Sequence, residues 1–140
     1  MVFIKHFIGI DLGTSAVKLL LVDENGQIRG EVTKEYPLSF PRPGWSEQEP
    51  ADWWKAVQHG ILELTERIDK SSVRGIGVGG QMHGLVALDE QDRVIRPAIL
   101  WNDGRTAPQT EYLNTVVGKE KLTAWTANIA FAGFTAPKLL

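Results

Sequence analysis

The chain has 140 residues, a net charge of −2, no cysteine and 43% hydrophobic residues. This length allows one domain or slightly less, with enough apolar residues for a real core. The small net charge argues against binding to nucleic acid or to an anionic membrane surface, and the lack of cysteine excludes disulfides and thiolate chemistry. No apolar run approaches the roughly 20 residues that span a bilayer. We therefore expect a cytoplasmic protein whose five tryptophans are mostly buried or line a cleft.

The first half of the chain predicts an antiparallel three-stranded meander followed by a helix. The run Asp23–Gly26 is typical of a hairpin turn, because Asn-Gly adopts the positive φ angles that such turns need. A proline-rich surface loop is expected from Pro37 to Pro50, and Pro50 suits the first position of a helix. Apolar residues at helical spacing predict an amphipathic helix that ends near Asp69, and Gly60 suggests close packing of this helix on the sheet. The expected strands are Phe7–Leu12, Ala16–Val22 and Ile28–Leu38, and the apolar helix positions are Trp54, Val57, Ile61, Leu64 and Ile68.

The second half of the chain predicts shorter strands and two further helices. Val73–Gly79 follows a helix, so it is expected to join the sheet parallel to an earlier strand. Asn102 and Asp103 are suited to cap the next helix. Together these elements predict an α/β fold, with a mixed sheet that contains the antiparallel three-strand meander and with flanking helices. The remaining expected elements are strands Leu85–Leu88 and Ala98–Trp101 and helices Arg105–Val117 and Lys119–Trp125.

A turn of small residues between the first two strands, Asp11–Ser15, is the first candidate site. It joins strand to strand and therefore differs from P-loops and dinucleotide fingerprints, which join strand to helix. Its backbone N–H groups and hydroxyls suit a phosphate, and Asp11 would repel that phosphate unless a divalent cation lay between them. Lys18 either adds positive charge there or is the solvent end of an alternating strand. The turn thus suggests a nucleotide–Mg²⁺ site, although a tight hairpin turn would use the same residues for geometry alone.

The second candidate site is the loop Gly80–Gly84, which follows the predicted strand 73–79. Open α/β sheets bind ligands at the ends of their strands, and glycine lets the backbone approach a ligand closely. Gln81 and His83 offer hydrogen bonds to such a ligand. The alternative is a β-turn with one satisfied histidine. Nucleophilic catalysis by this loop is not supported, because the chain has no cysteine and no serine in a nucleophile elbow that could pair with His83. A histidine metal site is not supported, since His6, His59 and His83 lack the spacing of metal ligands.

The segment Trp101–Thr106 is the third candidate site. Its asparagine and aspartate can bind the hydroxyl groups of a polyol, and its tryptophan offers a flat apolar face. The alternative is an ordinary helix start in which Arg105 pairs with Asp103. The run Trp45–Pro50 is either a lid or a loop before the helix, and the adjacent pair Trp53-Trp54 is expected to pack in the core.

In this order, these motifs resemble the FGGY carbohydrate kinases, and within that family most closely the kinases that phosphorylate xylulose. The pair GGQMHG and ILWNDGRT is specific, whereas DLGTS is shared by many sugar kinases. The resemblance covers essentially the whole chain. The matching segments are IGIDLGTSAVK (8–18), GWSEQEPADWW (44–54), GIGVGGQMHGLVALD (75–89), RPAILWNDGRT (96–106) and GFTAPKLL (133–140).

The resemblance implies an actin-like, ribonuclease-H-like ATPase fold and ATP-dependent phosphorylation of D-xylulose to D-xylulose 5-phosphate, with ATP and Mg²⁺ as cofactors. Residues 1–140 would form the N-terminal part of an incomplete first domain, and the second domain of such a kinase would be absent. Asp103 and Arg105 would either lie close to the sugar or organise its loop. The expected nucleotide-binding residues are Asp11, which is also the metal ligand, Gly13, Thr14, Ser15 and Lys18; the expected sugar-binding residues are Gln81, Met82, His83, Asp103 and Arg105.

The family's catalytic base is an aspartate far downstream, so no catalytic residue is assigned in this chain. We expect the 140-residue chain to bind sugar weakly, to turn over negligibly and to self-associate as a homo-oligomer through apolar surface. The expected partner is a small-molecule sugar, with no nucleic acid and no membrane. Two alternatives stay open: a non-catalytic ligand-binding or scaffolding module of the actin-like fold, and a kinase for another ketose or sugar acid.

Overall fold

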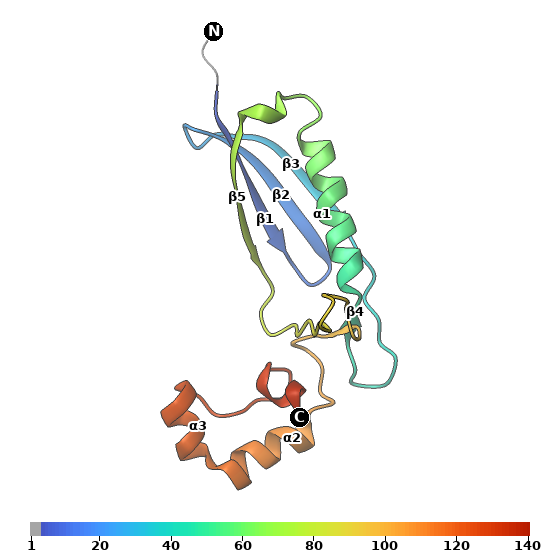
Figure 1. Ribbon diagram of the computed structural model, residues 1–140, viewed down its shortest axis with the longest axis vertical. Helices are drawn as coiled ribbons and strands as arrows, with labels where there is room; N and C mark the ends of the chain where they lie inside the picture. Colours follow the sequence, from blue (N-terminus) through green and yellow to red (C-terminus); the bar gives the residue numbers. More distant parts are fainter. Residues whose placement is uncertain (1–3) are drawn as a thin grey trace. The chain divides into compact units, whose positions relative to one another are not determined.

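The computed structural model describes residues 4–140, which divide into two compact units. The first unit contains the chain up to residue 37 and residues 51–81, and the second contains residues 38–50 and 82–140. In Figure 1 the first unit carries the labels β1, β2, β3 and β5 and most of α1, and the second carries β4, α2 and α3. Each unit has its own set of predicted site residues, so the two are described in turn.

The first unit is built on a four-stranded mixed sheet in the order β3-β2-β1-β5 (Figure 1). The first three strands form an antiparallel meander and β5 pairs parallel with β1, so both predictions are confirmed. In the hairpin turn Gly26 supplies a positive φ of 78°, and the Asp23 carboxylate accepts the backbone N–H groups of Asn25 and Gln27. The strands are β1 (His6–Leu12), β2 (Ala16–Asp23), β3 (Ile28–Glu35) and β5 (Val73–Gly80), so β3 ends before the predicted Leu38.

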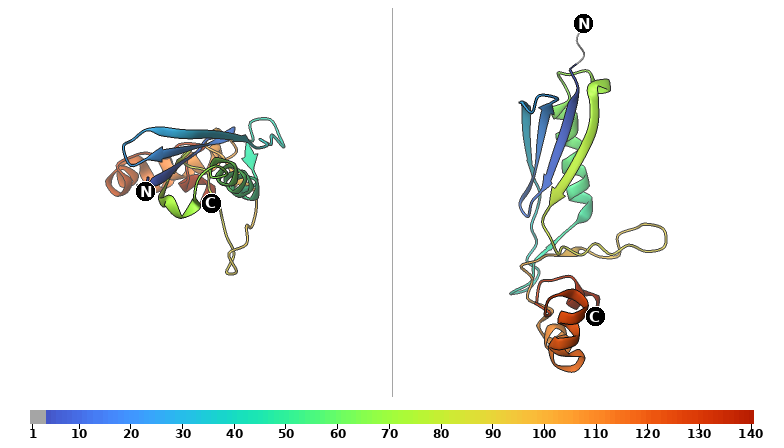
Figure 2. Two further views of the ribbon diagram at one scale, coloured as in Figure 1. Left: turned by 90° about the horizontal axis from the view of Figure 1, so that it is seen from above. Right: turned by 90° about the vertical axis from the view of Figure 1, so that its left-hand side faces the viewer.

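Helix α1 (Pro50–Leu64) packs on one face of this sheet (Figure 2). A Cβ atom at Gly60 would lie 2.4 Å from Cδ1 of the fully buried Leu19, which confirms that this glycine marks close packing of helix on sheet. The helix starts at the predicted Pro50 but ends at Leu64 instead of near Asp69. Asp69 instead caps a short 3₁₀ turn, η1 (Lys70–Ser72), through the backbone N–H of Ser71.

The predicted apolar stripe of α1 is confirmed at Val57 and Leu64, which are buried, and was wrong at Trp54. Trp53 is buried, whereas Trp54 is 63% exposed, because the helix turns the neighbouring stripe toward the sheet. The expectation for the tryptophans as a group was also wrong, since Trp101 and Trp125 are exposed as well. Helical spacing alone fits two adjacent stripes, and packing against the sheet selects one of them. The buried positions of α1 are Trp53, Ala56, Val57, Gly60 and Leu64.

The second unit contains little regular sheet. Strands β4 (Glu47–Gln48) and β6 (Ala98–Ile99) form a two-residue antiparallel pair, so the predicted loop 37–50 contains a strand and the predicted strand 98–101 is shorter. The predicted strand Leu85–Leu88 was wrong, because its ends make only isolated bridges to Ile99 and Val94. Apolar runs this short do not determine whether a segment finds a strand partner.

The rest of the second unit is helical. Helix α2 begins at Ala107 after Thr106, so neither Asn102 nor Asp103 caps it and the helix predicted from Arg105 starts two residues later. The predicted break between two helices is a π-helical turn that ends at Gly118, where φ is 97°. No helix of residues 4–140 is long and apolar enough to cross a membrane. The elements are α2 (Ala107–Tyr112), η2 (Leu113–Gly118), α3 (Lys119–Thr126) and the 3₁₀ turn η3 (Ala136–Leu139).

Candidate functional site

The first unit presents the predicted phosphate turn at the ends of β1 and β2. Asp11 pairs in register with Lys18 across these two strands, and its side chain is exposed. The backbone N–H of Gly13 donates to the carbonyl oxygen of Ala16 at 3.0 Å, which closes the turn. The Lys18 ammonium lies 3.0 Å from the Glu31 carboxylate, so this lysine is engaged with its neighbouring strand β3.

Tyr36 and Gln81 brace this turn from outside. The Tyr36 hydroxyl donates to the carbonyl oxygen of Gly13, and the Gln81 side-chain amide donates to the same oxygen at 3.4 Å. The Thr14 hydroxyl donates to Oε1 of Gln81 at 3.1 Å, and the backbone N–H of Gln81 donates to the carbonyl oxygen of Leu12 at 2.8 Å. The sequence grouped Gln81 with the sugar residues, but the structure places its side chain on the phosphate turn. Its contact with a sugar stays a prediction.

The Tyr36 hydroxyl is held in its protonated form at neutral pH. Burial raises the pKa of Tyr36 to about 12, and the negative charge of Asp11 adds to this rise. A protonated hydroxyl can donate a hydrogen bond, so Tyr36 keeps the Gly13 carbonyl occupied. Sequence reasoning missed this residue, because Tyr36 lies outside the turn motif and meets it only through folding.

Asp11 and Lys18 line an open hollow of about 560 Å³ on the sheet of the first unit. Glycine backbone contributes much of the wall, so a ligand could approach the main chain there. Among residues 4–140 no group of three or more histidine or acidic side chains could hold a metal ion. The residues lining the hollow are Gly9, Ile10, Asp11, Lys18, Leu20, Gly77, Val78 and Gly79.

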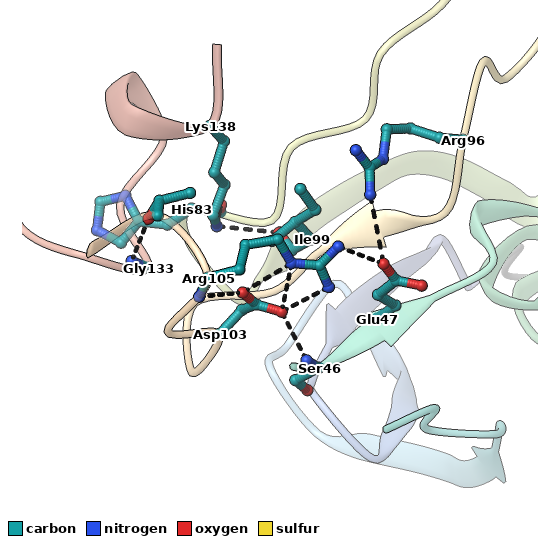
Figure 3. Close-up of polar contacts among 10 residues, drawn as sticks. Ser46, Glu47, His83, Arg96, Ile99, Asp103, Arg105, Gly133 and Lys138 are labelled. Atoms are coloured by element: carbon teal, nitrogen blue, oxygen red, sulfur yellow. Dashed lines mark hydrogen bonds and ion pairs between the residues drawn. The ribbon is translucent and has the colours of Figure 1, made fainter. Parts of the chain in front are cut away.

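In the second unit, the buried carboxylate of Asp103 is the centre of a polar network (Figure 3). It accepts the backbone N–H of Ser46 at 2.6 Å, the backbone N–H of Arg105 at 2.8 Å and the Arg105 guanidinium at 2.7–3.0 Å. Burial acts to raise the pKa of Asp103, but the hydrogen bonds from Arg105 and Ser46 outweigh it and hold the pKa below its usual range. These hydrogen bonds show the pairing of Asp103 with Arg105 that one of the two interpretations of the segment Trp101–Thr106 predicted.

The same guanidinium ties β4 to this network. Nη1 of Arg105 lies 2.6 Å from the Glu47 carboxylate, which also receives Arg96 at 3.3 Å (Figure 3). The Arg105 guanidinium lies 3.6 Å from the centre of the Trp45 ring, a cation–π stack. With its charge neutralised internally, Arg105 organises the segment around it. The sequence signal for Trp45 and Glu47 was the run Trp45–Pro50, whose role as a lid or a loop was left open.

The predicted sugar residues Met82 and His83 also lie in the second unit. Met82 is 67% exposed, and His83 has a left-handed backbone with φ of 64°. The His83 ring stacks on Phe134, with ring centres 3.9 Å apart. The Lys138 ammonium donates to the carbonyl oxygen of His83 at 2.5 Å. Phe134 and Lys138 were missed as site residues, although both lie in the segment GFTAPKLL, which carried part of the resemblance.

Comparisons with known proteins identify first the class of fold and then the family. The crystal structure of a xyloylose kinase from Brucella ovis resembles this chain with a TM-score of 0.89 and 48% identity, over 96% of this chain and 28% of that one. This chain has the actin-like ATPase fold of sugar kinases. Residues 6–140 match the model of the FGGY family of carbohydrate kinases, N-terminal domain. The chain belongs to the FGGY family of carbohydrate kinases.

Curated relatives lie within the same family. The chain is 46% identical over 134 residues to the xylulose kinase of Escherichia coli strain K12, which covers 96% of this chain and 27% of that enzyme. It is 48% identical over 141 residues to the xylulose kinase of Bacillus subtilis strain 168, and this alignment covers 97% of this chain and 28% of that enzyme. The chain thus spans little more than a quarter of the length of these relatives, and the resemblance seen in the motifs is confirmed at the level of the family.

Proposed function

We propose that this chain supplies the phosphate turn and the sugar-facing segments of a kinase that transfers phosphate from ATP to D-xylulose, giving D-xylulose 5-phosphate. The observation that carries the proposal is an exposed carboxylate, Asp11, beside a turn whose shape is fixed by Tyr36 and Gln81. Family membership supports the transfer of phosphate to a sugar, and relatives that are xylulose kinases support the choice of ketose.

On the nucleotide side, Asp11 would hold Mg²⁺ directly or through water. The metal, when bound, would neutralise charge on the β- and γ-phosphates. Gly13, Thr14 and Ser15 would lie against these phosphates, with Ser15 offering its backbone N–H and hydroxyl. The Gly13 N–H already donates to Ala16 and the Thr14 hydroxyl to Gln81, so either of these two donors would have to exchange its partner for a phosphate. Lys18 would contribute only if it exchanged its present partner Glu31 for a phosphate, so we assign it the weakest role of the set.

On the sugar side, Met82 and His83 would contact the ketose. Asp103 and Arg105 would act by organising the segment that faces the sugar, because both side chains are buried in their own network. Such positioning matters in phosphoryl transfer, where catalysis depends mainly on alignment and on charge stabilisation. Gln81 would connect the two sides in sequence, since it braces the phosphate turn and directly precedes Met82.

A base must also lie within hydrogen-bond reach of the attacking hydroxyl. A carboxylate that coordinates Mg²⁺ is a poor candidate, since the metal draws it away from the sugar. We therefore propose that residues 1–140 correspond to the N-terminal part of the first domain of a two-domain cytoplasmic kinase, that the base lies elsewhere in that kinase, and that this chain alone turns over negligibly.

The test is a chimeric kinase in which residues 6–140 replace the matching part of the Bacillus subtilis relative. Sugar-dependent release of ADP would be measured with D-xylulose and with a panel of other ketoses and sugar acids. We expect turnover with preference for D-xylulose, and no turnover by the 140-residue chain alone. Efficient turnover by that chain alone, or preference for another sugar, would contradict the proposal.

Substitutions in the chimera separate a kinase from a non-catalytic module. Asp11→Ala is expected to lower kcat by about 100-fold or more, as loss of a charge-stabilising group typically does. Asp89→Ala is the matched control, because Asp89 is a carboxylate in an exposed turn of the second unit. Unchanged kcat in Asp11→Ala would exclude the assigned role, and loss of sugar binding without loss of kcat in His83→Ala would favour a binding module.

A further inference from the structure

The Lys138 ammonium donates hydrogen bonds to backbone carbonyl groups of two separate segments. Its ammonium donates to the carbonyl oxygen of His83 at 2.5 Å and to that of Ile99 at 2.9 Å (Figure 3). The pKa of Lys138 is lowered to about 8, mainly by burial; the charge of Asp103 opposes this fall and that of Arg105 adds to it. A half-buried ammonium is costly unless its hydrogen bonds are made, so these two contacts constrain the segments they join.

His83 has a conformation that needs such a constraint. Its φ of 64° lies in the left-handed region, which only a few per cent of residues other than glycine adopt, with asparagine, aspartate and histidine the commonest among them. Such a backbone persists when the surrounding structure over-determines it. Two contacts from one segment do so here, because Phe134 stacks on the ring at 3.9 Å and an interplanar angle of 17° while Lys138 binds the carbonyl oxygen.

Gly133 explains why this segment is so closely placed. A Cβ atom at Gly133 would lie 2.0 Å from the carbonyl oxygen of Trp101, and the φ of this glycine is 83°. The backbone therefore passes directly against Trp101 in a conformation that only glycine adopts easily. This close contact fixes where the short segment that carries Phe134 and Lys138 begins.

We propose that Phe134 and Lys138 are positioning residues that hold the Met82-His83 pair in the conformation that meets the sugar, Phe134 through the His83 ring and Lys138 through the His83 carbonyl. The consequence for the sugar rests on the proposed function. The mechanical part, that residues 133–138 set the backbone of His83, stands on the described contacts alone.

The first test is a double-mutant cycle on the stability of the 140-residue chain. If Lys138 holds a strained His83, then Lys138→Met should lower the folding equilibrium constant of the second unit by only about threefold in the parent, because relief of the strain at His83 offsets part of the lost contact. In the His83→Gly background glycine adopts this φ without strain, so there is nothing to relieve and the loss should be about tenfold, equivalent to about 1.4 kcal/mol. Equal losses in both backgrounds would overturn the proposal. Lys121→Met on α3 is the matched control, because Lys121 is exposed.

The second test reads the His83 ring directly by NMR. Stacking on Phe134 predicts upfield-shifted His83 ring protons, and this shift should vanish in Phe134→Leu and in Lys138→Met. Lys138→Arg, which keeps a charged donor, should retain most of it. If Lys138→Met does not fold, Phe134→Leu and Lys138→Arg decide the matter: an unchanged shift in the first or a lost shift in the second would overturn the proposal.

The third test uses the chimeric kinase. Lys138→Met should raise KM for D-xylulose about tenfold and leave KM for ATP unchanged, since the contact acts on the sugar side. An equal rise in both constants would overturn the assignment to the sugar side. A chimera that phosphorylates no sugar would instead contradict the proposed function, and the NMR and stability results would still decide whether residues 133–138 position His83.

Discussion

The two units are stabilised in different ways. The first unit has three long strand pairings and an apolar layer between sheet and helix, in which Val17 and Leu19 are fully buried. The second unit has only two-residue strands, and side chains bind distant backbone groups in their place. Besides Asp103 and Lys138, Asn114 does so by bonding to both backbone groups of Ala130. The comparison teaches that the strands beside the phosphate turn are held by backbone pairing, with Tyr36 and Gln81 bracing the turn itself, whereas the proposed sugar-facing segments are held mainly by individual polar side chains.

The largest expected effect tests the apolar layer of the first unit. Leu19→Ala should reduce the free energy of unfolding by about 3–4 kcal/mol, because it removes a fully buried side chain and leaves a cavity. Leu20→Ala, on the opposite face of β2 and only partly buried, is the control and should cost less than half as much. Denaturant unfolding measures both, and equal losses would show that the layer is not the main stabilising feature.

Asp103→Asn tests the polar network of the second unit. It leaves the Arg105 guanidinium without its main carboxylate in a buried site, so we expect a loss of about 3 kcal/mol. Asp89→Asn is the matched control, since Asp89 also accepts two backbone N–H groups and an arginine, Arg93, but does so in an exposed turn. Amide hydrogen exchange resolves the two units, and a similar effect of both substitutions would remove the contrast between them.

Gly60→Ala tests how tightly α1 packs on the sheet. Alanine favours the helix by about 1 kcal/mol, but its Cβ would meet the buried Leu19 at 2.4 Å, and such overpacking costs about 1–3 kcal/mol. We expect a net loss of about 1 kcal/mol in thermal or urea unfolding. Gln58→Ala, on the exposed face of the same helix, should be neutral or slightly stabilising. A more stable Gly60→Ala variant would mean that Leu19 has room to move.

The pH dependence of Lys138 concerns the second unit. Its pKa is about 8 in the folded chain against an ordinary 10.5, so between these values the unfolded chain holds a proton that the folded chain has released. Lys138 should therefore make the free energy of unfolding rise with pH in this window. Lys138→Met should remove that contribution, and an unchanged slope between pH 8 and 10.5 would contradict it.

Tyr36 gives the opposite sign in the first unit. Its pKa is about 12 in the folded chain against an ordinary 10.0, so at pH values between these the folded chain keeps a proton that the unfolded chain loses. Its contribution is fully present below pH 10 and is lost as the pH rises through 12. Tyr36→Phe should flatten this fall, measured by unfolding at closely spaced alkaline pH values; a fall of the same steepness in the variant would be evidence against it.

The same contrast explains how much the sequence could predict. The meander and the parallel strand followed from local alternation and a hairpin turn, and the start of α1 from Pro50. Val57 and Leu64 were placed correctly on the buried stripe of α1, but Trp54 was not, because Trp53 and Trp54 fit helical spacing equally well until a sheet is packed against them. In the second unit the decisive contacts join Arg105 to Glu47 and Lys138 to His83, which lie 58 and 55 positions apart in sequence. No local pattern encodes such contacts, so the site motifs were found without the side chains that hold them.

Gly133 carries a consequence for how this sequence can vary. Every amino acid other than glycine has a Cβ atom, and at this position that atom would lie 2.0 Å from the carbonyl oxygen of Trp101. A collision with main chain cannot be relieved by choosing another rotamer. Every substitution of this glycine is therefore expected to be deleterious in a mutational scan. A substitution at Gly133 should be tolerated only when the stretch around Trp101 is altered at the same time.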